Sequence, residues 1–344
     1  MNTLFIEAIS AQMAGMTVLD SVTFTVKPQE VVAVIGPPGC GKQSLLRVLT
    51  GQLQARSGRI LWGSEDITAC PPDQRPFVAL KPRDASMGEC HVIDHLRAAR
   101  LATENQPPDT EHLLHLLELM PYAKTPMASL NADQYQRVAL ACALLQTTAM
   151  VLLDMCAMLG CASEMVRLQA CLRHIRREIK PTIIMVADNA CDVLPVANRL
   201  VVMAGGRVRQ VGAVDALYRY PGDAHVACSV GHCNLIPGEY MGAGLFRSQK
   251  GMRLPCANPY QNGASATVLA IRPEAIAIGP PMGGMQALVT DVAFMGAQIE
   301  YQLDLDGHAL RAVAPAWGSG IPDLQPGAAV DVAWDAHDAQ PLSY

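Results

Sequence analysis

The stretch AVIGPPGCGKQSLL, residues 33–46, contains residue types that bind phosphate. Glycines permit a turn whose backbone N–H groups point inward, and a lysine adds positive charge beside the start of the following helix. Such loops carry Ser or Thr directly after the lysine to bind Mg²⁺. Here Gln43 follows Lys42, and the hydroxyl comes one residue later. The residues predicted to surround phosphate are Gly36, Pro37, Pro38, Gly39, Cys40, Gly41, Lys42, Gln43 and Ser44.

The segments around this loop predict an α/β fold. The run EVVAVIG at 30–36 is typical of a buried parallel strand, and KQSLLRVLTG at 42–51 has apolar residues at helical spacing. The same alternation returns as AMVLLD at 149–154, an amphipathic helix at 164–179 and PTIIMVAD at 181–188. Strands alternating with helices indicate a mostly parallel sheet that positions the loop.

Two further regions differ in pattern. Residues 83–145 show mainly helical spacing and predict an inserted helical subdomain. Beyond residue 236 the sequence becomes rich in Gly, Pro and short alternating runs, which predicts a small all-β barrel. We therefore expect two domains, 1–236 and 237–344.

Composition excludes several classes of protein. The chain of 344 residues has a net charge of -5 and is only 17% charged, so it lacks the basic surface that nucleic-acid binding requires. We expect neither a secretion signal nor a membrane anchor at its start, and no apolar run reaches the length of a spanning helix. The 11 cysteines are scattered without zinc-site spacing, which indicates reduced thiols and no metal site.

Several segments together resemble the ATP-binding subunits of ABC transporters over residues 1 to about 235. They are the loop, SGRI at 57–60, QRVALACALL at 136–145 and VLLD at 151–154. The tail, with IRPEAIAIG at 271–279, resembles the TOBE-like barrel of the importer branch that serves polyamines, iron, phosphonates and sugars.

This resemblance implies a set of partners and a location. It implies ATP as the fuel, a membrane permease pair and a periplasmic solute-binding protein. It also implies a dimer with itself or with a homologous ATP-binding subunit. The expected location is peripheral, on the cytoplasmic face of the inner membrane.

The chain departs from the family pattern at the nucleotide. The adenine-stacking aromatic is replaced in QMAGMTVLD at 12–20, where Met13 or Ala14 takes its place. Pro82 stands where the family has the glutamine that senses Mg²⁺ and the permease. Gln43 is a poorer ligand for a hard cation than a hydroxyl. We therefore expect weak nucleotide binding that is insensitive to Mg²⁺.

The family's signature segment LSGGQ is also changed. It reads Leu130, Asn131, Ala132, Asp133 and Gln134 in this chain. The two lost glycines normally let the backbone approach the partner's γ-phosphate, and we expect the carboxylate of Asp133 to repel that phosphate. Asn131 is expected to cap the helix that follows.

The residues implied in catalysis are replaced as well. Asp154 matches the family's metal-binding aspartate, but Met155 stands where the general-base glutamate belongs. Asp188 occupies the position of the switch histidine, and residues 158–161 lack the family's next aspartate. Loss of a general base lowers the rate by about 100- to 10,000-fold. No residue of this chain is therefore assigned as catalytic.

Three functions follow from these observations. The chain is an ATP-binding import subunit with impaired or absent hydrolysis, an active transport ATPase, or a scaffold that has kept only the fold. In the last case the candidate residues for ligand sensing are Arg272, Glu274 and His308 of the tail. The family activity, ATP hydrolysis, depends on the positioning and charge stabilisation that the replaced residues supply.

Overall fold

The computed structural model describes residues 2–80, 90–101, 108–146, 150–157, 161–258, 266–317 and 324–344. Its internal contacts divide the chain into two compact units, Met1–Val214 and Asp215–Tyr344. This division lies N-terminal to the boundary expected at residue 236, because two short helices group with the C-terminal strands. The boundaries of the family domains stay a prediction.

The first unit is built on a six-stranded sheet that carries the phosphate-loop segment. Its strands lie in the order β10-β9-β3-β8-β7-β6, and all pairs are parallel except β10 with β9. The central strand β3 is fully buried, with Val34 opposite Val186 on one side and Val201 on the other. The strands are β3 (Val31–Ile35), β6 (Phe77–Ala79), β7 (Met150–Asp154), β8 (Ile183–Ala187), β9 (Arg199–Ala204) and β10 (Arg207–Ala213).

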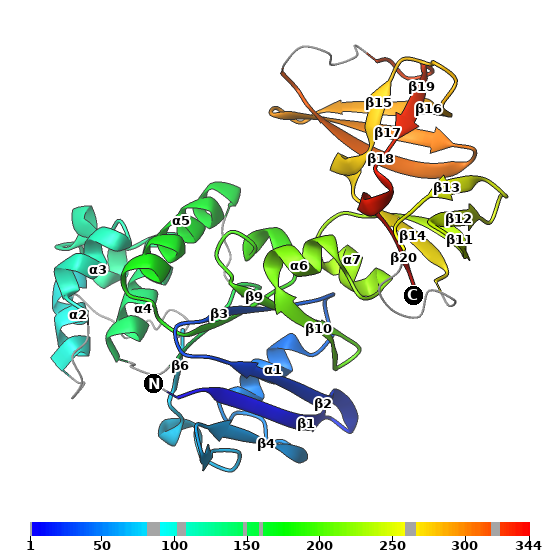
Figure 1. Ribbon diagram of the computed structural model, residues 1–344. Helices are drawn as coiled ribbons and strands as arrows, with labels where there is room; N and C mark the ends of the chain where they lie inside the picture. The colour runs from blue at the N-terminus through cyan, green and yellow to red at the C-terminus, as the bar shows by residue number, and fades with distance from the viewer. Residues whose placement is uncertain are drawn as a thin grey trace. The chain divides into compact units, whose positions relative to one another are not determined.

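A second, antiparallel sheet covers the helix that follows the loop. Its strands are β1 (Leu4–Met13), β2 (Met16–Val26), β4 (Ser57–Trp62) and β5 (Glu65–Asp66). Helix α1 (Lys42–Leu49) packs against β2 of this sheet and against β7 and β8 of the larger one (Figure 1). One apolar core joins both sheets and α1, so the start of α1 is held firmly beneath the loop.

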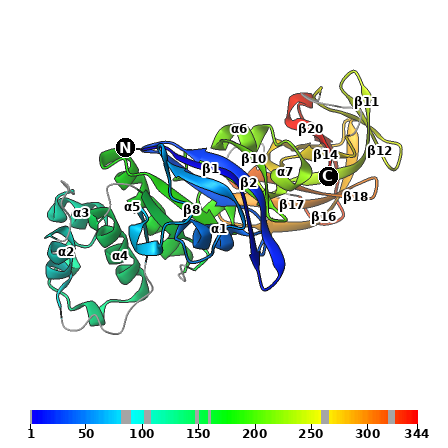
Figure 2. The same ribbon diagram turned by 90° about the horizontal axis from the view of Figure 1, so that it is seen from below.

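Four more α-helices are described in this unit. They are α2 (Val92–Leu101), α3 (Thr110–Leu116), α4 (Ala132–Gln146) and α5 (Ala162–Glu178). One of them, α4, packs on β6 at the edge of the large sheet. Helices α2, α3 and α4 pack on one another and form a separate group in the ribbon (Figure 2). They correspond to the helical insertion expected at 83–145.

The described part of the second unit contains two antiparallel sheets and two α-helices. The sheets have the strand orders β13-β12-β11-β14-β20 and β15-β19-β16-β17-β18, and side chains from both form one apolar core. The helices are α6 (Val214–Arg219), which starts at the boundary between the units, and α7 (Ala224–Val230), which packs on β14. The strands are β11 (Asn234–Gly242), β12 (Leu245–Ser248), β13 (Arg253–Pro255), β14 (Val268–Ile271), β15 (Ala277–Gly279), β16 (Met285–Phe294), β17 (Gln298–Leu305), β18 (His308–Pro315), β19 (Ala329–Ala333) and β20 (Ala339–Leu342).

Short 3-10 helices connect several of these elements. They are η1 (Pro72–Gln74), η2 (Met120–Tyr122), η3 (Met127–Ser129), η4 (Ala190–Asp192), η6 (Pro273–Ala275) and η7 (Ala336–Asp338). The predicted α/β fold with a helical insertion and an all-β C-terminal region is confirmed.

Candidate nucleotide-binding site

The sheet brings three predicted site segments to one edge. Strands β3, β8 and β7 are parallel neighbours, so their carboxyl ends lie side by side, where open α/β sheets bind ligands. Ile35 pairs with Ala187, and the next residues are Gly36 and Asp188. Asp154 ends β7 opposite Val186. The register thus places the loop beside both aspartates.

Two glycines allow the loop to pass close to its neighbours. Gly41 has a φ of +104°, and a Cβ on it would lie 2.5 Å from the carbonyl oxygen of Val18. A Cβ on Gly36 would lie 2.1 Å from the carbonyl oxygen of Met203. Any other residue would force the backbone apart at these points, so the loop requires glycine there.

Lys42 is held by the loop and by Asp188. Its ammonium donates to the carbonyl oxygens of Gly36 at 2.7 Å and Pro37 at 2.9 Å. It also forms an ion pair of 2.8 Å with Oδ1 of Asp188. Lys42 is only 3% exposed, whereas the side chain of Asp188 is 48% exposed. The residue predicted to occupy the switch-histidine position therefore contacts the loop lysine directly.

The charged side chains at this edge carry more negative than positive charge. Lys42 pairs with Asp188, and Asp154 ends the neighbouring strand β7. The nearby Cys156 thiol has its pKa raised to about 12 by burial and then by these two carboxylates. The thiol is therefore neutral at physiological pH. Two carboxylates against one ammonium disfavour a highly charged anion.

The expected magnesium position offers few oxygen ligands for the cation. The Gln43 side chain is exposed, and Ser44 is buried in the first turn of α1. Oδ1 of Asp154 accepts hydrogen bonds from the backbone N–H groups of Cys156 at 3.1 Å and Ala157 at 3.2 Å. Within the described ranges, no three His, Cys, Asp or Glu side chains gather as a metal site. These residues fit a hard cation poorly.

Met155 contributes no polar group to this edge. Its side chain is 3% exposed and lies in the apolar interior, and its backbone N–H donates to the carbonyl oxygen of Val186 at 2.9 Å. A thioether cannot accept a proton from water at neutral pH. The position implied for a general base is therefore filled by an inert side chain.

The loop has fewer backbone donors than its glycines suggest. Pro37 and Pro38 have no N–H, and the N–H of Cys40 donates to the carbonyl oxygen of Pro37 at 3.2 Å. This loss of donors was not predicted, although the adjacent prolines signal it. The loop would therefore offer a phosphate group fewer backbone N–H donors than predicted.

The signature segment corrects one expectation. Asn131 and Gln134 exchange side-chain to backbone hydrogen bonds at 2.8 and 3.0 Å, so the predicted cap of α4 is confirmed as a capping box. Asp133, however, is 5% exposed, and its carboxylate binds Arg137 at 2.6 Å. The expected repulsion of a phosphate by Asp133 was wrong, because this carboxylate is turned into the helical group and neutralised there.

Some predicted positions lie elsewhere. Pro82 and residues 158–160 fall outside the described residues. Met13 and Ala14 lie at the turn between β1 and β2, and Met13 is exposed, with its sulfur 3.6 Å from a guanidinium nitrogen of Arg47. No aromatic side chain follows at this turn before Phe24. The weakened adenine platform stays a prediction.

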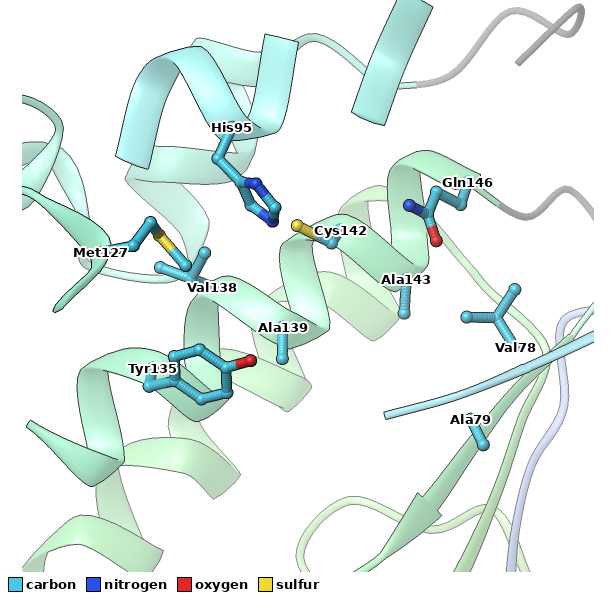
Figure 3. Close-up of a pocket in the computed structure, with 10 residues that line it drawn as sticks. All are labelled: Val78, Ala79, His95, Met127, Tyr135, Val138, Ala139, Cys142, Ala143 and Gln146. Atoms are coloured by element: carbon cyan, nitrogen blue, oxygen red, sulfur yellow. The ribbon is translucent and has the colours of Figure 1, made fainter. Parts of the chain in front are cut away.

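A separate recess of about 200 Å³ opens between β6, α2 and α4. The imidazole of His95 and the thiol of Cys142 face each other inside it (Figure 3). Burial lowers the pKa of His95 and raises that of Cys142 to about 12, so both groups are neutral. Its lining residues are Val78, Ala79, His95, Met127, Tyr135, Val138, Ala139, Cys142, Ala143 and Gln146.

Two of the tail residues proposed for ligand sensing, Arg272 and Glu274, form hydrogen bonds within the C-terminal unit, and a role in sensing stays a prediction. The guanidinium of Arg272 donates to four carbonyl oxygens, those of Tyr218, Ala227, Gly231 and His232, at 2.8 to 3.1 Å. Glu274 accepts a 2.5 Å hydrogen bond from the Tyr218 hydroxyl. His308 is buried, and burial lowers its pKa. A cavity of about 570 Å³ beside Arg272 and Glu274 is lined by both positive and negative side chains.

Comparison with known proteins decides the family. The family model described as "ABC transporter" matches residues 19–157, and the "TOBE domain" model matches residues 269–342. The chain is 30% identical over 328 residues to the Fe(3+) ions import ATP-binding protein FbpC of Brucella abortus (strain 2308), covering 92% of each chain. The chain belongs to the ABC transporter family.

Within the ABC transporter family the chain is of the import ATP-binding type. It is 30% identical to the sulfate/thiosulfate import ATP-binding protein CysA 2 of Chromobacterium violaceum, over 96% of this chain and 92% of that protein. It is 29% identical to the spermidine/putrescine import ATP-binding protein PotA of Borreliella afzelii, over 85% of each. The resemblance read from the sequence is confirmed.

Solved structures agree on the fold. An ATP-binding cassette of an ABC transporter, crystallised in its ADP conformation, covers 66% of this chain with a TM-score of 0.56 at 22% identity. The chain covers 99% of that cassette. No helix among the described residues is long and apolar enough to cross a membrane.

Proposed function

We propose that this chain is the ATP-binding subunit of an import system, and that it holds nucleotide at residues 36–44 but hydrolyses it slowly or not at all. One observation carries the impairment: the buried, apolar Met155 directly follows Asp154, where the family has its general base. Phosphoryl transfer relies on positioned charged and polar groups. The rate should fall with their loss.

The loop fits a phosphate group in part. Gly36 and Gly41 keep its backbone shape, and Lys42 supplies a positive charge at the start of α1. The two prolines and the Asp188 carboxylate act against tight binding. We propose weak binding of ATP with little dependence on Mg²⁺, because Gln43 and the engaged Asp154 offer poor cation ligands.

The proposed partners follow from the import systems named for the relatives. We propose that the chain binds membrane permease subunits, pairs with itself or with a homologous ATP-binding subunit, and depends indirectly on a periplasmic solute-binding protein. This assembly would hold it at the cytoplasmic face of the inner membrane. Pairing alone would not restore hydrolysis, because Ala132 and Asp133 replace the two glycines that let the backbone approach the partner's nucleotide.

An active transport ATPase is the second candidate. The identity of 30% across 92% of an import ATP-binding protein favours it. An assay of phosphate release by the purified chain, alone and with its permease, separates the two. We expect release at the background level with Mg²⁺ present, and vigorous Mg²⁺-dependent release would refute the impairment. Unaltered melting in millimolar ATP would refute nucleotide binding and leave a scaffold.

A further inference from the structure

The ammonium of Lys42 has used all its hydrogen-bonding capacity within the chain. A lysine ammonium has three protons to donate. Three oxygen atoms accept them: the carbonyl oxygens of Gly36 and Pro37 and Oδ1 of Asp188, at 2.7, 2.9 and 2.8 Å, and the Cys40 sulfur lies at 3.6 Å as a weaker fourth acceptor. A phosphate oxygen can therefore bind Lys42 only by displacing one of these three.

Asp188 is the acceptor that can leave. The carbonyl groups of Gly36 and Pro37 belong to the loop itself, and moving them would reshape the glycine backbone around Met203 and Val18. The Asp188 side chain is 48% exposed, so its carboxylate can turn into water and be hydrated there. The exchange of Asp188 for a phosphate oxygen replaces one anion on Lys42 by another.

When its carboxylate moves away from Lys42, Asp188 still remains at the site. Its backbone directly follows β8, in register with the first residue of the loop. The displaced carboxylate stays near any anion held on Lys42, and Asp154 ends the neighbouring strand β7. Its charge repels the ligand in addition to having competed for the lysine.

We infer that Asp188 is an internal competitor of phosphate for Lys42, so that this one side chain sets how tightly the loop binds a nucleotide. The inference rests on the proposed function, since it concerns the same loop. It assigns to Asp188 a role in affinity that is separate from the loss of hydrolysis caused by Met155. The ligand class is a nucleoside di- or triphosphate.

The test measures affinity and leaves catalysis aside. ATP is titrated by calorimetry into the full chain, with and without Mg²⁺, for the natural sequence and for Asp188→Asn. An ion pair with a half-exposed carboxylate is worth up to about fivefold in a binding constant, so the variant should bind ATP tighter by about two- to fivefold. Asp188→Ser should show the same gain, which guards against misfolding of one variant.

Two controls localise the effect. Asp73→Asn removes the same charge from an exposed position on η1, beside Gly51 at the far end of α1, and should leave the affinity unchanged. In a chain that carries Lys42→Ala, Asp188→Asn should give a smaller gain, because only the charge repulsion is then removed. An equal gain with and without Lys42 would overturn the inference.

The outcomes separate the two claims. Equal, measurable affinity in the natural chain and in both Asp188 variants would overturn the internal competition and leave the proposed function in place. An absence of binding in all of them, with folding intact by circular dichroism, would overturn the proposed function, and the inference would fall with it.

Discussion

Lys42 and Asp188 form an ion pair at the point where two neighbouring parallel strands end in register. Their charged atoms lie 2.8 Å apart, with the lysine buried and the aspartate half exposed. The lysine is also bound by two carbonyl oxygens of its own loop. The pair therefore connects the phosphate loop after β3 to the turn after β8, and its two members contribute unequally to the fold.

Replacement of Lys42 should destabilise the chain more than replacement of Asp188. Lys42→Ala leaves the carbonyl oxygens of Gly36 and Pro37 without their donor, which costs about 1 to 3 kcal/mol. Asp188→Asn removes one partner of a half-exposed pair, which costs about 0 to 1 kcal/mol. Urea unfolding of both variants gives the two free energies, and a larger loss for Asp188→Asn would contradict this division.

Restoring the implied catalytic residues should restore hydrolysis in part. Gln43→Ser, Pro82→Gln, Met155→Glu and Asp188→His are combined in one chain. A positioned general base accelerates proton transfer by about 100- to 10,000-fold, so Mg²⁺-dependent phosphate release should rise at least tenfold above that of the natural chain.

The control for this variant is the same chain with Met155→Gln in place of Met155→Glu. Glutamine has a volume similar to that of glutamate and a polar end, but it cannot act as a base. The control chain should therefore stay at the background rate. Equal rates for the two chains would show that Met155 does not occupy the position of the base. Thermal melting checks that neither substitution at this buried position has unfolded the protein.

The sequence was sufficient for the fold because its signals are local and strong. The apolar run before Gly36 and the helical spacing after Lys42 each predict one element, and the structure has them as β3 and α1. The contact between Lys42 and Asp188 needs the strand register, which links residues 146 positions apart. Residue spacing alone does not contain that register.

Asp133 shows a different limit of sequence analysis. Alignment with the signature segment predicted an exposed carboxylate aimed at a phosphate. In the structure Asp133 faces inward, because Arg137 lies one turn further along α4 and is itself 1% exposed. The direction of a helical side chain depends on which face of the helix is buried, and the family pattern does not state it.

Restoring the family's glycine at this position should therefore damage the fold. Asp133→Gly leaves the guanidinium of Arg137 buried without its carboxylate, and removal of one partner from a buried pair costs about 3 to 5 kcal/mol. The exposed Asp94, in the first turn of α2, is the matched control. Asp94→Gly should cost about 1 kcal/mol. Similar melting temperatures for the two variants would contradict the structural role of Asp133.

The thiols should react in an order set by their surroundings. The exposed Cys161 has a lowered pKa, because its sulfur accepts hydrogen bonds first from Ser163 and then from the backbone of Glu164. The pKa values of Cys142 and Cys156 are raised to about 12 by burial. Since the thiolate is the reactive form, Cys161 should react with iodoacetamide at a lower pH than an ordinary thiol.

Mass spectrometry after alkylation at pH 7.5 and pH 9 measures this order. The modified fraction of Cys161 should be large at both values and rise with pH, while Cys142 and Cys156 stay protonated and unmodified. Cys161→Ser should remove the fast phase. Faster alkylation of Cys156 than of Cys161 in the folded chain would contradict the buried, neutral state of that thiol.

Arg272 should be essential to the stability of the C-terminal unit. Its guanidinium lies 4.1 Å from the ring centre of Tyr218 and binds the carbonyl oxygens at the ends of α6 and α7. Arg272→Ala leaves these buried acceptors unsatisfied, which should cost about 2 to 4 kcal/mol and lower the melting temperature of this unit. Arg272→Lys cannot reproduce the planar fork and should recover less than half of the loss.

Arg247→Ala, at an exposed pair with Glu239, is the control and should change stability by less than about 1 kcal/mol. If calorimetry found Arg272→Ala as mild as Arg247→Ala, the helices would be held to the sheet by their apolar contacts alone.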